Sequence, residues 1–205
     1  MGYPGRTNRY ASSFEISEKE NITNPIIVAS RRSKLDVWKK HMDKDPKIRL
    51  LYADKYFGIS NYADSAKWEN ICLRRYDVAD IRAEEEQHLQ EKYGNLLAQM
   101  KEAYTINQDH IRNKTWYKEC FNAPCDWLAT ARRVLSVARD MNKQKIEKID
   151  KNHPLMKKYL AAFKRDFTKF DITTDRELFG AQLHLFINNI DPKYCSDTMK
   201  AWMKE

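Results

Sequence analysis

Residues 45–59 read DPKIRLLYADKYFGI, and this stretch has the pattern of an amphipathic helix. An aspartate directly before a proline favours a helix start, because the Asp45 carboxylate can cap free backbone N–H groups and Pro46 has no N–H to satisfy. Apolar side chains then recur three or four residues apart, at Ile48, Tyr52, Tyr56 and Ile59. The stretch therefore predicts a helix that begins at Pro46 and buries one face.

Similar signals recur along the rest of the chain. Helix starts or restarts are predicted by capping residues before a proline and by a capping box, at Asn24-Pro25, His153-Pro154, Asp191-Pro192 and residues 174–177 (TDRE). Helical apolar periods cover residues 28–42, 81–104, 128–146 and 156–170. Residues 178–190 are apolar on nearly all sides, which is typical of a buried helix. We predict an all-α fold of seven or eight helices in one irregular, bundle-like domain.

The composition argues against β structure and against a membrane span. Only five of the 205 residues are glycine, against a usual share of roughly 7%, so turn signals are too few for a sandwich or barrel. The apolar runs are only a few residues long, whereas a membrane-spanning helix needs about 20 residues. No apolar stretch follows Met1–Arg6, so we expect no signal peptide within this chain.

The chain carries 37 Lys and Arg against 29 Asp and Glu, a formal net charge of +8. Such an excess can mark a nucleic-acid-binding surface. Here the basic pairs, such as Arg31-Arg32 and Lys157-Lys158, are spread among acidic residues, and no recognition-helix, RNA-binding or zinc-finger motif accompanies them. We therefore expect no nucleic-acid partner and no membrane partner.

The histidines and cysteines do not form a metal-binding pattern. Glu85 and His88 make the one Glu-x-x-His of the chain, and a di-iron bundle needs two. The cysteines lack a CxxC pair and a histidine at zinc-finger spacing, which favours buried free thiols at Cys72, Cys120, Cys125 and Cys195. A bridge between Cys120 and Cys125 remains the alternative. We expect no metal and no cofactor.

Residue types also give no self-contained catalytic centre. The chain contains no Gly-x-Ser-x-Gly nucleophile motif and no Gly-rich phosphate loop. The large aromatic residues are spaced mostly as core positions, so we predict that they pack inside the fold: Trp38, Tyr52, Tyr56, Trp68, Trp116 and Trp127.

The opening run, MGYPGRTNRY over residues 1–10, resembles a run in the bacterial periplasmic dipeptidyl-peptidases, the family typified by dipeptidyl-peptidases seven and eleven. The resemblance continues through residues 24–25, 34–39, 42–49, 52–56, 59–62 and 73–78, and it covers roughly residues 1–80. It implies a serine exopeptidase with a chymotrypsin-like double β-barrel and a large helical insertion over the active-site cleft.

This resemblance implies that residues 1–12 are the extended end of a β-barrel lobe and that residues 13–205 are the helical insertion, or lid. The catalytic His and Asp of the family precede the matching run and its Ser follows the insertion, so we expect no catalytic residue in this chain and no activity of the chain alone. The resemblance implies a peptide substrate and the β-barrel lobes of the same polypeptide as partners, and it allows a second copy of the parent. The implied compartment is the periplasm.

One site residue carries over from the family, Asn61 in Ser60-Asn61-Tyr62. An asparagine of the family's helical insertion binds the α-amino group of the substrate, and an amide oxygen accepts hydrogen bonds from an ammonium group without adding charge. The alternative for Asn61 is a helix end or cap. The family commonly has an aromatic and a basic residue after Asn-Tyr, whereas Ala63 and Asp64 follow here, which alters the shape expected of the pocket.

These observations lead to one functional hypothesis and one alternative. The hypothesis is a helical cap of a serine exopeptidase that releases dipeptides from peptide N-termini, with a part in α-amine recognition and in gating of the cleft. The alternative is a stand-alone basic helical scaffold that binds protein or nucleic acid, and it predicts a complex that weakens steeply with salt.

Overall fold

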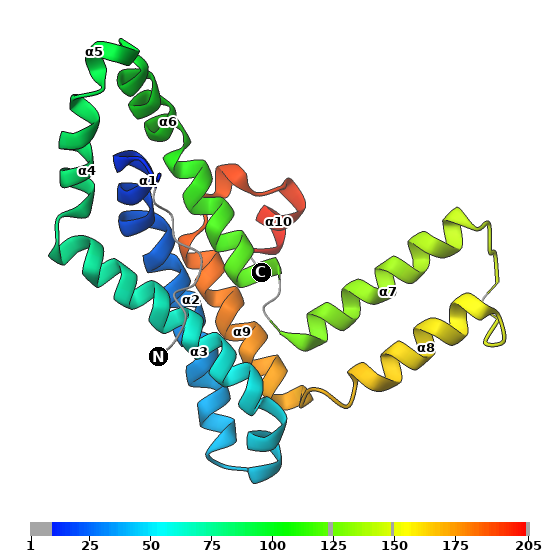
Figure 1. Ribbon diagram of the computed structural model, residues 1–205. Coiled ribbons are helices and arrows are strands. Elements are labelled where there is room, and N and C mark those ends of the chain that lie inside the picture. Colours follow the sequence, from blue (N-terminus) through cyan, green and yellow to red (C-terminus); the bar gives the residue numbers. More distant parts are fainter. Residues whose placement is uncertain (1–9, 123–124, 149, 204–205) are drawn as a thin grey trace. The chain divides into compact units, whose positions relative to one another are not determined.

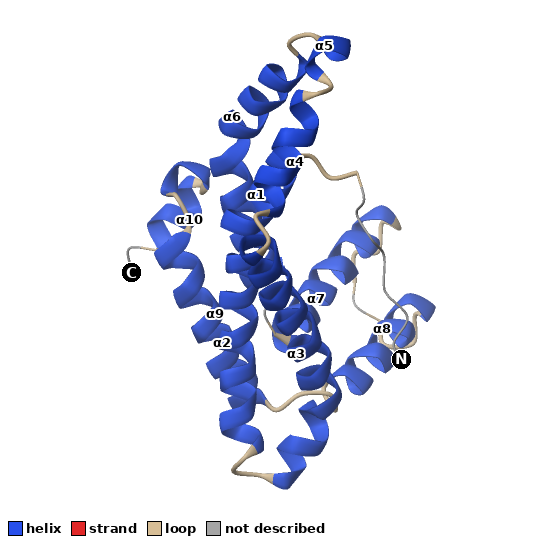
Figure 2. Ribbon diagram, turned by 60° about the vertical axis from the view of Figure 1, so that its left-hand side comes forward, coloured by secondary structure: helices blue, strands red, loops and turns tan. Residues whose placement is uncertain are grey.

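The computed structural model describes residues 10–122, 125–148 and 150–203, and within these ranges it contains helices, turns and no strand (Figure 2). The prediction of an all-α fold is confirmed. Seven of the described helices have ten or more residues, in agreement with the seven or eight predicted. The predicted extended segment over residues 1–12 lies largely outside the described residues.

Most of the α-helices follow one another with short connections, and a longer one over residues 144–153 joins α7 to α8 (Figure 1). Their bounds are α1 Ser13–Glu18, α2 Asn24–Met42, α3 Pro46–Arg75, α4 Val78–Gln87, α5 Gln90–Tyr93, α6 Leu96–Tyr117, α7 Asp126–Lys143, α8 Pro154–Asp166, α9 Ile172–Asn189 and α10 Asp197–Trp202. Two π-helical segments, Lys19–Thr23 and Lys118–Asn122, and one 3-10 turn, Pro192–Tyr194, complete the described elements.

None of the described helices combines the length and the apolar character that crossing a membrane requires.

The chain divides into two compact units. The first consists of the described parts of residues 1–29, 61–116 and 190–205, and the second of residues 30–60 and the described parts of residues 117–189. The chain passes between the units within α2 and again within α3.

In the first unit, α1 packs against α4. Ser12 caps α1 by accepting a hydrogen bond from the Glu15 N–H at 3.2 Å. The backbone N–H and the hydroxyl of Ser13 both donate to the Glu86 carboxylate, at 2.9 and 2.5 Å. One carboxylate of α4 thus satisfies the backbone and side chain of the first residue of α1.

The predicted boundary at Asn24-Pro25 agrees with the start of α2, but the capping role predicted for Asn24 is wrong. The π-helical segment Lys19–Thr23 leads into α2 without interruption, and the Asn24 N–H donates to the carbonyl of Lys19. The wider π-turn lets the helical path continue to Pro25, which has no N–H to donate. Asn24 is buried, and its amide donates to Glu69 of α3 at 3.2 Å. Asn24 therefore joins two helices and does not cap one.

The single helix predicted over residues 81–104 is also wrong. The chain leaves the helical conformation after α4 and again at Gly94, whose φ of 60° favours glycine. The apolar period continues across this break, but a period reports only the face on which residues lie. The result is a helical hairpin of α4 and α6 with the one-turn α5 at its end (Figure 1).

In the second unit, α9 supplies several of the most buried positions, among them Leu178, Gln182 and Phe186. The amide of Gln182 accepts a hydrogen bond from the Ser30 hydroxyl at 2.7 Å and donates to the Ser30 carbonyl at 3.1 Å. The helix predicted here is present, but it is buried along one face only, because Gly180, His184 and Asn188 are exposed. The helix begins at Ile172, before the predicted capping box, because the Asp171 carboxylate accepts from the Thr174 N–H at 2.7 Å.

The other predicted helix starts and the aromatic core can now be compared with the structure. Asp45 accepts from the Lys47 N–H at 2.7 Å and α3 begins at Pro46, as predicted. His153 caps α8, and Asp191 caps a 3-10 turn. Trp38, Tyr52 and Trp116 are buried and Tyr56 is half-buried, whereas Trp68 and Trp127 are exposed. Core packing was therefore the wrong prediction for Trp68 and Trp127.

The four cysteines are free in the structure. Cys120, Cys125 and Cys195 are buried, as predicted, and Cys72 is exposed. Burial raises the pKa of Cys120, and it raises the pKa of Cys125 to about 11. The buried thiols therefore remain protonated at neutral pH, which makes them poor nucleophiles.

Candidate functional site

Asn61 lies inside α3, fourteen residues before its last residue, Arg75. Its side chain is exposed, and it makes no hydrogen bond to the residues that the structure describes. The alternative interpretation of Asn61 as a helix end or cap is therefore wrong. The helix continues through this point because Ala63 and Ala66 are buried on its inner face. Asn61 is consequently held on a regular helix with a free amide.

Asn61 is one of a row of residues that we call the α3 outer face: Asn61, Asp64, Trp68 and Ile71. Residues three or four apart lie on the same side of a helix, and these four follow that spacing. The Trp68 side chain is 57% exposed, and the ammonium of Lys67 lies 5.2 Å from the centre of its ring. The α3 outer face thus combines an amide oxygen, a carboxylate and an indole ring, all of which attract cations.

A second set of functional groups lies in the other unit, around Tyr52 of α3. The Tyr52 hydroxyl donates to the Asp175 carboxylate at 3.0 Å and accepts from the Asp171 N–H at 2.9 Å. The other oxygen of Asp175 accepts from the backbone N–H of Trp127 at 2.6 Å. Asp175 therefore satisfies one of the free N–H groups in the first turn of α7.

Lys55, one turn after Tyr52, completes this arrangement. Its ammonium donates to the Asp126 carboxylate at 2.6 Å and to the carbonyl of Lys169 at 2.8 Å. Asp126 is the first residue of α7, and Lys169 follows the end of α8. Tyr52 and Lys55 together hold both chain ends of the α7–α8 hairpin, and we call this set of contacts the hairpin clamp.

Burial dominates the electrostatics of the clamp. Asp175 is 0% exposed, and burial raises its pKa, against the opposing effect of the hydrogen bond from the Trp127 N–H. Burial and the nearby Asp175 also raise the pKa of Tyr52, so this phenol stays protonated. Both oxygens of Asp175 already have donors, which leaves the group without a free acceptor for catalysis.

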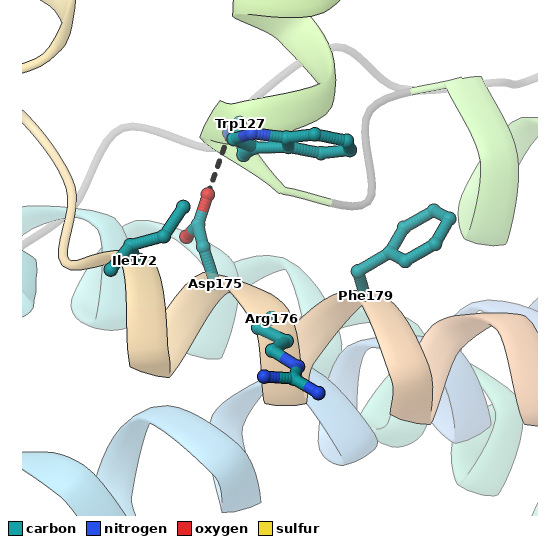
Figure 3. Close-up of a pocket in the computed structure, with 5 residues that line it drawn as sticks. All are labelled: Trp127, Ile172, Asp175, Arg176 and Phe179. Carbon is teal, nitrogen blue, oxygen red and sulfur yellow. Dashed lines mark hydrogen bonds between the residues drawn. The ribbon is translucent and has the colours of Figure 1, made fainter.

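An apolar pocket of about 290 Å³ opens beside the clamp. Its lining residues are Trp127, Ile172, Asp175, Arg176 and Phe179 (Figure 3). The rings of Trp127 and Phe179 lie 6.3 Å apart across it, while Asp175 directs its carboxylate to the Trp127 backbone. The pocket can receive an apolar group, but it offers no nucleophile or base. Asn61 is not among its lining residues.

Sequence reasoning missed the clamp. Tyr52 and Trp127 were predicted as packing residues, and Asp175 as part of a capping box. An aspartate at the start of an otherwise apolar helix was the one available signal, since a buried carboxylate needs donors. Among the described residues, no group of three or more His, Cys, Asp and Glu side chains is placed to hold a metal ion.

Comparison with known proteins places this chain among peptidases. The sequence profile described as Peptidase S46 matches residues 1–205. Dipeptidyl-peptidase 7 of Phocaeicola vulgatus is 29% identical over 196 residues, which cover 91% of this chain and 27% of that protein. The Asp/Glu-specific dipeptidyl-peptidase of Flavobacterium psychrophilum is 28% identical over 196 residues, with the same coverage. This chain therefore spans just over a quarter of the length of these relatives.

A crystal structure shares the fold. It is that of Porphyromonas endodontalis DPP11 in complex with the dipeptide Arg-Glu, and it superimposes with a TM-score of 0.72. The match covers 99% of this chain and 30% of that chain, at 21% sequence identity. The predicted resemblance to the dipeptidyl-peptidases is confirmed by the family profile and by the curated relatives. This chain belongs to the peptidase S46 family.

Proposed function

We propose that this chain is the helical cap of a serine-type dipeptidyl-peptidase that releases dipeptides from the N-termini of peptides. The observation that carries the proposal is the match of the whole chain to the S46 profile, together with relatives named as dipeptidyl-peptidases. In this proposal the catalytic Ser, His and Asp and the β-barrel lobes belong to other parts of the parent polypeptide. In this proposal the parent acts in the periplasm.

The proposed role of Asn61 is to receive the free α-amino group of the substrate. An exopeptidase cleaves at a fixed distance from the end of the peptide. A neutral acceptor that binds the terminal ammonium group fixes this distance. A regular helix and an exposed amide support this role, because the helix fixes the backbone position from which the acceptor projects.

The proposed gating role is that the cap opens for substrate entry and closes for the chemical step, as lids do in many enzymes. A closed cap excludes water and brings the amine-binding residue to the substrate. The hairpin clamp supports this role within the second unit, because it fixes the α7–α8 hairpin to α3 and α9.

The test is an Asn61→Ala variant of the full-length parent enzyme, assayed with dipeptidyl substrates that carry a free amine. Loss of a hydrogen bond to a charged group lowers kcat/KM by about 10- to 100-fold, and we expect KM to carry most of the change. Alanine favours helix more than asparagine does, so the fold should tolerate the change.

Asn107→Ala is the matched control, since Asn107 is also exposed and inside a helix, α6, where its amide only donates to the carbonyl of Ala103. Unchanged kinetics for Asn61→Ala would remove the assignment of Asn61. Absence of any dipeptide release by the unmodified parent would overturn the proposed function itself.

A further inference from the structure

The positive charge of the chain is concentrated in one hairpin. Residues 126–166, which contain α7 and α8, carry 11 Lys and Arg against 5 Asp and Glu. This segment alone accounts for +6 of the net charge of +8, and the other 164 residues are close to neutral. The basic residues are therefore not spread evenly along the chain, and the excess of positive charge in the hairpin requires an explanation.

Helix α7 is amphipathic, and part of its apolar surface is exposed. The residues of α7 that are buried are Thr130 and Val137. Helices α7 and α8 are joined by a hydrogen bond from the Tyr159 hydroxyl to Asp140 at 2.6 Å and by an ion pair of Arg133 with Asp166. The contact with α8 is thus partly polar.

Other apolar residues of α7 form a row that is largely exposed. Trp127, Ala131, Val134 and Ala138 recur at helical spacing, and Leu135 adjoins them. Val134 is 54% exposed and Leu135 is 60% exposed, and Trp127 is 44% exposed. We call this row the α7 apolar face. Arg139 and Lys143 follow Leu135 along the same helix and are exposed, so cationic groups border the apolar face.

Charge and side-chain type together select the kind of partner. A second copy of this chain would bring two hairpins of +6 together, and like charges repel. A nucleic acid would satisfy the charge, but interfaces with nucleic acids are polar and would leave Val134 and Leu135 with no apolar surface. An anionic lipid surface suits both the positive charge and the exposed apolar side chains, because phosphate headgroups attract the basic residues and the acyl chains receive the apolar ones.

We propose that the α7–α8 hairpin is a docking surface for anionic lipid membranes, with α7 lying in the plane of the headgroups and its apolar face turned toward the acyl chains. The expectation of no membrane partner rested on the lack of a spanning segment, and surface binding does not need one. The proposal goes beyond the proposed peptidase role and does not depend on it.

The test is co-sedimentation of the 205-residue chain with phosphatidylglycerol-containing vesicles and with vesicles of phosphatidylcholine alone. We expect binding to the anionic vesicles at low salt, weak binding to the neutral ones, and release as salt screens the headgroups. Trp127 fluorescence should shift to shorter wavelength on binding, although the other four tryptophans also contribute to the signal.

Two variants separate the apolar and the electrostatic parts. The double change Val134→Ser with Leu135→Ser should lower the partition coefficient about tenfold or more, because these side chains no longer gain from burial. The double change Arg139→Glu with Lys143→Glu should lower it by a similar factor at low salt. Both pairs are exposed, so the fold should persist, and circular dichroism checks this.

Matched controls are Ile106→Ser, which removes an apolar residue that is 71% exposed, and Lys101→Glu, which reverses an exposed charge, both in α6. Neither should change binding. The proposal is overturned if the chain ignores anionic vesicles at low salt, if it binds neutral vesicles equally well, or if the α7 variants bind like the controls. Binding to RNA or to an acidic polypeptide without vesicle binding would also overturn it.

Discussion

The carboxylate of Asp175 in α9 accepts a hydrogen bond from the backbone N–H of Trp127 in α7 at 2.6 Å. These two residues are 48 positions apart in the chain. The first turn of α7 is therefore capped by another helix of the same unit, and the capping group also accepts the hydroxyl of Tyr52 at 3.0 Å. The position and the stability of the α7–α8 hairpin thus depend on the buried carboxylate of Asp175.

Replacing Asp175 with alanine should destabilise the protein by about 2–4 kcal/mol, because two buried donors lose their acceptor. Asp175→Asn should cost less, since the amide oxygen can still accept one of the two hydrogen bonds. Urea denaturation followed by circular dichroism measures both changes. Asp54→Ala is the control, because Asp54 is an exposed carboxylate of α3, and a large effect there would remove the special role of Asp175.

The contribution of Asp175 should depend on pH in a defined direction. Burial raises its pKa in the folded protein above the usual value of 3.8. As pH rises through 3.8, the unfolded chain loses the proton while the folded protein retains it, which lowers the free energy of unfolding. The decrease ends once pH passes the raised pKa of the folded state.

Asparagine at position 175 has no proton to lose, so Asp175→Asn isolates this effect. The free energy of unfolding of the unmodified protein, minus that of Asp175→Asn, should fall from acidic to neutral pH. Denaturation curves at several pH values give this difference. The other carboxylates are present in both proteins, so their titration contributes equally to the two free energies and cancels in the difference. A difference that is constant or that rises with pH would contradict the raised pKa.

Lys55→Ala should loosen the base of the α7–α8 hairpin with little effect on global stability. The Lys55 ammonium holds Asp126 and the Lys169 carbonyl, but it is partly exposed, so the cost in unfolding free energy should be about 1 kcal/mol. Hydrogen exchange read by mass spectrometry should show faster exchange in peptides from the first turn of α7. Lys47→Ala, at an exposed position of the same helix, should leave that exchange unchanged.

Glycine-to-alanine changes should act in opposite directions at two positions. Gly94 has a φ of 60° and ends α5, so alanine there should destabilise the α4–α6 hairpin by about 1–2 kcal/mol. Gly180 lies inside α9, and a Cβ added there meets nothing within 4 Å. Alanine at 180 should stabilise the protein by about 0.5–1 kcal/mol. Thermal denaturation of the two variants checks both signs.

Local patterns in the sequence determined the fold class and several boundaries. Asp45-Pro46 and His153-Pro154 marked the starts of α3 and α8 correctly, because a cap acts on backbone groups two or three residues away. The low glycine content correctly predicted long helices, and the runs up to residue 80 pointed to the right family. The caps are contained within a few neighbouring residues, and the glycine content and the family runs can be read without knowing which segments contact one another.

Contacts between distant segments determined the rest. Asn24 appeared to be a cap, but its amide bonds to Glu69, 45 residues later. Trp127 has the apolar character of a core residue, yet no helix among the described residues covers it fully. Asp175 gains its role from Tyr52 and Trp127, which lie 123 and 48 positions away. Periodicity states which residues share a helix face, and only the packing of one helix on another decides whether that face is buried, exposed or bound to a distant partner.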